Sequence, residues 1–206
     1  MVALLGAGAA LEAEIKDGWR ALHIAAAGGH ASTVEALLAV GAALEAETKD
    51  GCRALHRATI NGHASIVEAL LGAGAALEAE TKDGRRVIHF AARTGHASTV
   101  AALLAAGAAL EAETKDGRRA IHFAAAGGHA STVEALLAAG AALEAEDNNG
   151  CRPLHHAAAN GDSSTVEALL TAGAAVEAED NDGWRALHIA AESGDASTVA
   201  ALLGAG

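Results

Sequence analysis

Histidine is the residue type in this sequence best suited to chemistry, because imidazole binds metals and exchanges protons near neutral pH. Six of the eleven histidines recur at an interval of 33 residues: His23, His56, His89, His122, His155 and His188. A zinc site needs three or four ligands that converge on one point. Side chains that recur in a stack of helices are instead spread along a line at about 8 to 10 Å per step. We therefore expect this histidine column to form structural hydrogen bonds and to bind no metal.

Two further patterns could carry catalysis or metal binding. His155 and His156 are adjacent, and a ligand role for them needs a carboxylate or thiol supplied by a neighbouring unit. Ser, Thr, His and Glu residues could also form a nucleophile and its base, but they recur in most copies of the pattern rather than once at a cleft. We expect no catalytic residue, no cofactor and no enzymatic activity.

The elements that position these residues follow the same 33-residue period. A glycine after Asp or Asn marks each copy, at Gly18, Gly51, Gly84, Gly117, Gly150 and Gly183, and predicts a tight turn with positive φ. A short helix is expected next, for example over 120–127, followed by a glycine turn and a second helix. In that helix Val133, Leu136 and Leu137 form an apolar stripe at helical spacing. The polar residue after the turn glycine, or the Ser-Thr that follows it, can cap the second helix, and in the first copy Ser32 and Glu35 have the spacing of a capping box.

Six copies of Leu-His or Ile-His, each followed by a glycine turn and Val-x-x-Leu-Leu, resemble the ankyrin repeat family. The resemblance implies an all-α repeat fold, an ankyrin solenoid of stacked helix-turn-helix units with projecting β-hairpin tips. Residues 1-206 then form a single domain, with a half-repeat at 1-14 and repeats at about 15-47, 48-80, 81-113, 114-146, 147-179 and 180-206. One departure is that arginine stands in place of the threonine of the family's Thr-Pro before Leu-His, with Pro153 the only proline, so the hydroxyl that usually braces the histidine is missing.

An arginine column accompanies the histidines, at Arg20, Arg53, Arg86, Arg119, Arg152 and Arg185. Two glutamates precede each arginine, as Glu111 and Glu113 precede Arg119. One hypothesis is a groove for phosphate or an acidic peptide, and the other is a ladder of ion pairs between repeats. We favour the ladder, because two carboxylates accompany each guanidinium.

Composition limits the partners and the compartment. A formal net charge of -12 disfavours nucleic acid and anionic membranes, and favours a basic or polar protein partner. Cys52 and Cys151 lie three repeats apart, beyond the reach of a disulfide, so both are expected to be free thiols in the cytoplasm or another reducing compartment. The first residues match a half-repeat rather than a signal peptide, and no apolar stretch approaches the roughly 20 residues of a membrane helix.

The positions that vary between copies are the candidates for recognition. The tip column follows the tip glycine and consists of Trp19, Cys52, Arg85, Arg118, Cys151 and Trp184. The turn column precedes the turn between the helices and includes Ile60, Asn61, Arg93, Thr94, Asn160 and Glu192. By resemblance to the family, both columns line the concave face and tips that bind a protein partner. The alternatives are drift on a solvated edge, a structural or synthetic consensus-like array without a dedicated partner, and the ankyrin portion of a larger protein.

The two ends of the array lack the polar outer face of a capping repeat. An apolar segment lies at Ala3 to Gly6, and Val199, Leu202 and Leu203 form an ordinary internal stripe at the other end. We expect the terminal half-repeat to fray, and copies of the chain to associate end to end.

Overall fold

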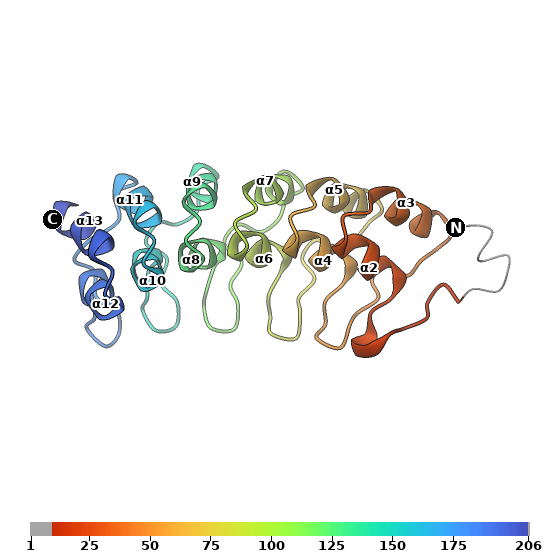
Figure 1. Ribbon diagram of the computed structural model, residues 1–206, viewed down its shortest axis with the longest axis horizontal. Helices are drawn as coiled ribbons and strands as arrows, with labels where there is room; N and C mark the ends of the chain where they lie inside the picture. The colour runs from red at the N-terminus through yellow and green to blue at the C-terminus, as the bar shows by residue number, and fades with distance from the viewer. Residues whose placement is uncertain (1–9, 206) are drawn as a thin grey trace.

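The computed structural model describes residues 10–205, in which consecutive helix pairs lie side by side in one elongated row (Figure 1). The first helix of each pair belongs to one layer and the second helix to another (Figure 1). The first helices are α2 (Ala21–Ala27), α4 (Ala54–Ile60), α6 (Val87–Arg93), α8 (Ala120–Ala126), α10 (Pro153–Asn160) and α12 (Ala186–Ser193). The second helices are α3 (Ala31–Ala39), α5 (Ala64–Gly72), α7 (Ala97–Ala105), α9 (Ala130–Ala138), α11 (Ser163–Thr171) and α13 (Ala196–Ala205). A single 3-10 turn, η1 (Lys16–Gly18), precedes α2.

Tight turns project from the layer of first helices as the predicted tips (Figure 1). In one of them the backbone N–H of Thr114 donates to the carbonyl of Arg118, and that of Gly117 donates to the carbonyl of Thr114, both at 2.9 Å. Gly117 has a φ of 75°, the left-handed conformation that the Asp-Gly sequence predicts. The residues flanking the tips form no strand ladder. Within residues 10–205 the only strand-type pairing is an isolated antiparallel bridge between Glu179 and Arg185.

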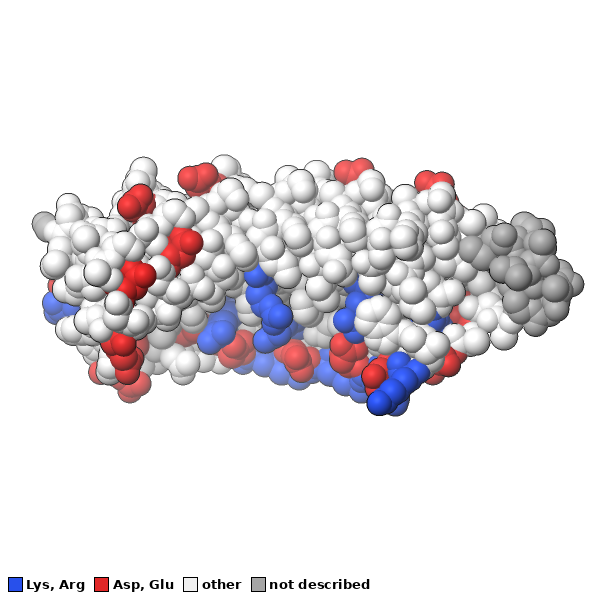
Figure 2. Space-filling model, viewed as in Figure 1, with Lys and Arg blue, Asp and Glu red and all other residues white. Residues whose placement is uncertain are grey.

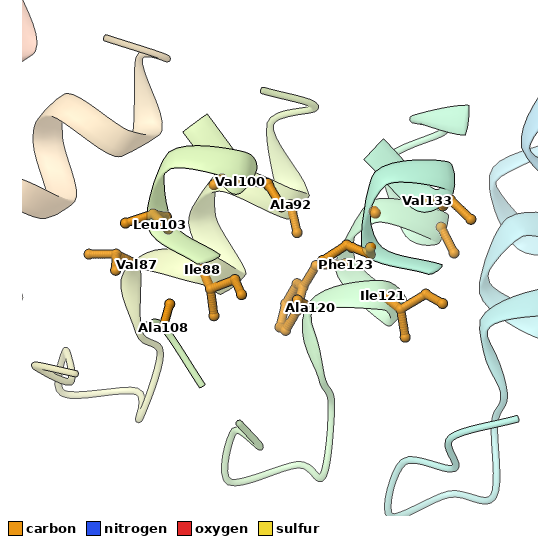
Figure 3. Packing of buried hydrophobic residues seen from close by; sticks show 14 of the residues in the cluster. Val87, Ile88, Ala92, Val100, Leu103, Ala108, Ala120, Ile121, Phe123 and Val133 are labelled. Atoms are coloured by element: carbon orange, nitrogen blue, oxygen red, sulfur yellow. The ribbon is translucent and has the colours of Figure 1, made fainter. Parts of the chain in front are cut away.

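The core is a continuous layer of small and branched side chains between the helix pairs. Val133 and Leu136 are 0% exposed, and Leu137 packs on the same core while partly buried, which confirms the predicted stripe. Ala124 is also fully buried, and its small side chain allows adjacent first helices to approach closely. Figure 3 shows Phe123 lying between the α8–α9 pair and the preceding pair. Each pair buries its apolar surface against its neighbours, so stability accumulates along the row.

The predicted caps of the second helices are found in part: the side chain of Asp162 accepts a hydrogen bond from the backbone N–H of Thr165 at 2.9 Å and caps α11. Ser32 lies inside α3, and the residue that caps this helix is His30, so the predicted capping box of Ser32 and Glu35 is wrong. The histidine at this position points to the preceding pair in later copies, where His129 Nε2 lies 3.0 Å from the carbonyl oxygen of Arg93. The His129 side chain therefore contacts the preceding helix pair and does not cap the start of its own helix, α9.

The ends of the array are only partly within the described residues. The segment from Ala3 to Gly6 lies outside them, and fraying there stays a prediction. At the other end Leu202 is buried, Val199 is half-buried and Leu203 is 64% exposed. The last helix pair therefore presents open apolar surface. Within residues 10–205, no helix has the length and apolar character needed to cross a membrane.

Candidate protein-binding surface

The histidine column holds adjacent parts of the backbone together. Nδ1 of His122 accepts a hydrogen bond from the backbone N–H of Arg119 at 3.0 Å, and its Nε2 donates to the carbonyl of Ala145 at 2.9 Å. Both contacts recur at His23, His56, His89 and His155. These bonds confirm the structural role predicted for the column. The arginine backbone N–H, rather than a side-chain hydroxyl, braces the ring.

The surroundings of these rings favour neutral imidazole. The N–H of Arg53 faces Nδ1 of His56, so the ring proton resides on Nε2, and protonation of Nδ1 would break that bond. Burial and the nearby arginine cations lower the pKa of His56 to about 4. Burial also lowers the pKa values of His23, His89 and His122. Within residues 10–205, no group of three or more metal-binding side chains converges.

The arginine column forms the predicted ladder. The guanidinium of Arg119 donates to Glu111 at 2.6 Å and to Glu113 at 2.8 Å. The second oxygen of Glu111 accepts the backbone N–H of Ala142, 31 residues further on, at 3.0 Å. Each such glutamate thus connects an arginine to the loop after the next second helix, and the arrangement recurs along the row. Because carboxylates already occupy the guanidinium groups, these arginines are poorly placed to bind a phosphate or acidic peptide.

The tip column packs against the next helix pair. The guanidinium of Arg57 lies 4.3 Å from the ring centroid of Trp19 and pairs with Asp50 at 2.9 Å. Burial opposes ionisation of Asp50, but hydrogen bonding from Thr48 and the charge of Arg57 outweigh it and lower the pKa of Asp50 to about 2. Trp19 is therefore held beneath a cation that comes from the following pair.

The partners of the tip column form a third variable column, which was not among the positions predicted for recognition. It consists of the residues directly after the histidines: Ile24, Arg57, Phe90, Phe123, His156 and Ile189. Arg85 lies over the ring of Phe123 at 5.5 Å, which repeats the 38-residue spacing of Trp19 and Arg57. The signal that could have revealed this column was its variation in an otherwise regular pattern. Together the two columns form one surface across adjacent pairs.

A buried polar cluster lies under the fourth and fifth members of the tip column. The side chain of Asp147 is 1% exposed and accepts hydrogen bonds from the backbone of Asn149 and Cys151 at 2.9 and 3.0 Å. Arg118 Nε lies 3.5 Å from this carboxylate, and His156 Nε2 lies 3.0 Å from it. Burial lowers the pKa of His156 to about 4, as does the neighbouring His122. The two histidines of the doublet therefore have separate partners and do not form one ligand pair.

The two cysteines of the tip column differ in exposure. Cys52 is 4% exposed and Cys151 is half-buried, and both are free thiols, as predicted. Burial raises the pKa of each thiol to about 11, which disfavours a reactive thiolate.

Three residues of the turn column make side-chain hydrogen bonds, either within their own helix pair or to the preceding pair. Asn61 Nδ2 donates to the carbonyl of Arg57 at 2.9 Å, and Thr94 Oγ1 donates to that of Phe90 at 2.8 Å. Asn160 reaches the carbonyl of Ala126 in the preceding pair at 3.0 Å. The remaining positions are half-buried Ile60 and exposed Arg93 and Glu192. Basic side chains lie near the middle of the face shown in Figure 2, and acidic ones lie towards the C-terminal helices.

The stacked helix pairs and projecting tips define a repeat solenoid, a class in which each unit contacts only its neighbours. A family model that describes ankyrin repeats in three copies matches residues 1–81, 73–147 and 121–206. The chain belongs to the ankyrin repeat family. A search of curated proteins finds no significant match. Ankyrin repeats are generally protein–protein interaction modules, and the family is generally non-catalytic.

Proposed function

We propose that this chain is a non-enzymatic scaffold that binds a partner protein across the tip column and the exposed part of the turn column. The observation that carries this proposal is the contrast between a nearly invariant scaffold and the varied side chains on this surface. Trp and Arg, which dominate protein-binding hot spots, occupy four of the six tip positions. Arg85 and Arg93 have no ion-pair partner among residues 10–205, so they remain available to a partner.

We also propose that the scaffold is divided into six repeats, at about 15-47, 48-80, 81-113, 114-146, 147-179 and 180-206. The repeat at 114-146, for example, contains α8, α9 and the tip before them. The burial of Cys52 makes Trp184, Arg85 and the exposed turn residues the better candidates for direct contact. A structural array without a dedicated partner remains the alternative, and the binding experiment separates the two.

The experiment compares the proteins captured by three immobilised chains. The surface variant carries Arg85→Ala, Arg93→Ala, Trp184→Ala and Glu192→Ala, which leave the ladder and the buried Asp147 cluster intact. The control variant carries alanine at four exposed positions of the second helices: Glu35, Glu68, Glu134 and Glu167. Circular dichroism and unfolding curves establish that all three chains are folded.

The scaffold proposal expects a saturable partner that binds the parent and the control variant and loses at least about tenfold in affinity for the surface variant. Loss of two or more hot-spot contacts of about 1 kcal/mol each accounts for that factor. Equal capture by all three chains, or capture by none, contradicts the proposal and favours the structural array.

A further inference from the structure

Trp184 presents an aromatic surface that the neighbouring residues among 10–205 cover only in part. Trp184 is 39% exposed, more than Trp19, the other aromatic residue of the tip column. The ring stands edge-on to His188, with centroids 6.3 Å apart and planes at 89°. A shallow depression beside it is lined by Asp182, Gly183, Trp184, His188, Ala191 and Glu192.

The first helix pair shows which group packs on an indole ring at this position of the repeat. Trp19 occupies the same position of the repeat, and its depression is lined by Asp17, Lys49, Asp50 and Arg57 as well. There the Arg57 guanidinium lies over the indole, 4.3 Å from the ring centroid. No cation lies over the ring of Trp184 within the part of the chain that the structure describes. The same aromatic position is therefore filled by an arginine in one place and open in the other.

The charge around Trp184 favours a cation more strongly than the charge around Trp19. Asp182 corresponds to Asp17, while Glu192 stands where the first pair has Ala27. Residues 144–206 contain eleven acidic and only two Lys or Arg residues, a net charge of -9 out of -12 for the chain. Acidic side chains are also visible around the C-terminal helices in Figure 2.

We propose that Trp184, Asp182 and Glu192 bind an arginine side chain of the partner protein. The guanidinium lies on the indole ring, as Arg57 lies on Trp19, and the carboxylates of Asp182 and Glu192 neutralise its charge. Arginine is favoured over lysine because its planar, weakly hydrated head group stacks on an aromatic ring. This inference rests on the proposed function, because it names the chemistry of one contact on the binding surface.

The test follows the indole Nε1–H resonances of Trp19 and Trp184 in the whole chain by NMR. The probe is N-acetyl-arginine amide, and the matched control is N-acetyl-citrulline amide, which has the same shape without the charge. The expected result is a saturable shift of the Trp184 resonance with arginine, about fivefold to tenfold weaker binding of citrulline, and an unchanged Trp19 resonance. Glu192→Gln, an exposed substitution that leaves the core intact, should weaken arginine binding by about twofold to fivefold.

Three results with the probe overturn the proposal: equal shifts with arginine and citrulline, no saturable shift of Trp184, or full retention of arginine binding by the Glu192→Gln, Asp182→Asn double variant. A Trp184 shift that depends on protein concentration without any probe also overturns it, because a second copy then occupies the site. The capture experiment tests the scaffold proposal separately from the arginine site. Arginine binding with no captured partner would sustain this site while contradicting the scaffold proposal.

Discussion

Acidification should destabilise this solenoid through its neutral, buried histidines. The pKa of His56 is about 4, against 6.5 for an unhindered imidazole. Above pH 6.5 neither the folded nor the unfolded chain protonates this residue, and its full contribution to stability is present. As the pH falls from about 6.5 to about 4, the unfolded chain binds a proton that the folded chain does not, so stability is lost over that window.

The size of this effect follows from the difference in pKa. A difference of about 2.5 units, at 1.36 kcal/mol per unit, corresponds to about 3 kcal/mol for His56 alone. His23, His89 and His122 shift in the same direction and add to the loss. Asp50, whose pKa is lowered to about 2, acts in a different window, because its contribution is present above pH 3.8 and is lost below it.

The assay is urea unfolding, followed by circular dichroism, at a series of pH values from about 7.5 to about 5.5, a range that lies above the pH at which most carboxylates titrate. We compare the parent with His56→Gln and with Ile66→Val, which loses about 0.5 to 1.5 kcal/mol of packing in the same helix pair without removing a titrating group. The parent and Ile66→Val should show the same decline in stability with falling pH. His56→Gln should show a shallower decline, by up to one proton. A pH-independent stability in the parent, or an identical slope in His56→Gln, would refute this reasoning.

Four other predictions concern a contrasting pair of glycines, the core, the ladder and the ends. Gly117→Ala should lower the free energy of unfolding by about 1 kcal/mol or more, because φ is positive and the added Cβ would lie 2.8 Å from the backbone nitrogen of Asn148. Gly72→Ala, where the Cβ meets nothing within 4 Å, should instead raise it by up to about 1 kcal/mol, and opposite signs in urea titrations are the check. Leu136→Ala should cost about 2 to 5 kcal/mol in the same titration, and a cost below 1 kcal/mol would contradict the assignment of Leu136 to the core. If the arginine ladder stabilises the fold, raising the salt concentration to about 1 M should modestly lower the urea concentration at the midpoint of unfolding. An unchanged or higher midpoint counts against a stabilising ladder. Light scattering over a wide concentration range should show association through the ends, and a constant monomer mass would exclude it.

The features that depend on local chemistry could be predicted from the residue types and their spacing. The 33-residue period predicted the helix pairs, because Asp-Gly and Gly-His sequences permit positive φ and Val-x-x-Leu-Leu produces one apolar face on a helix. It also predicted the hydrogen-bonded histidine column and the ion-pair ladder, since both recur in register with the helices. The same reasoning placed Ser32 at the start of a helix incorrectly, because alternative caps one or two residues apart are indistinguishable from residue types alone.

The contacts by which one repeat completes the next could not be predicted in this way and follow from the stacking of the helix pairs. The tertiary structure revealed that Glu111 reaches the backbone of Ala142, and that Arg57 covers Trp19. Partners 31 and 38 residues apart meet because stacking brings adjacent units into contact, and residue spacing within one unit does not contain that geometry. For the same reason Cys52 is 4% exposed and Trp184 is 39% exposed, although both occupy the tip column. The exposure of a side chain in a stack depends on what the following unit places over it.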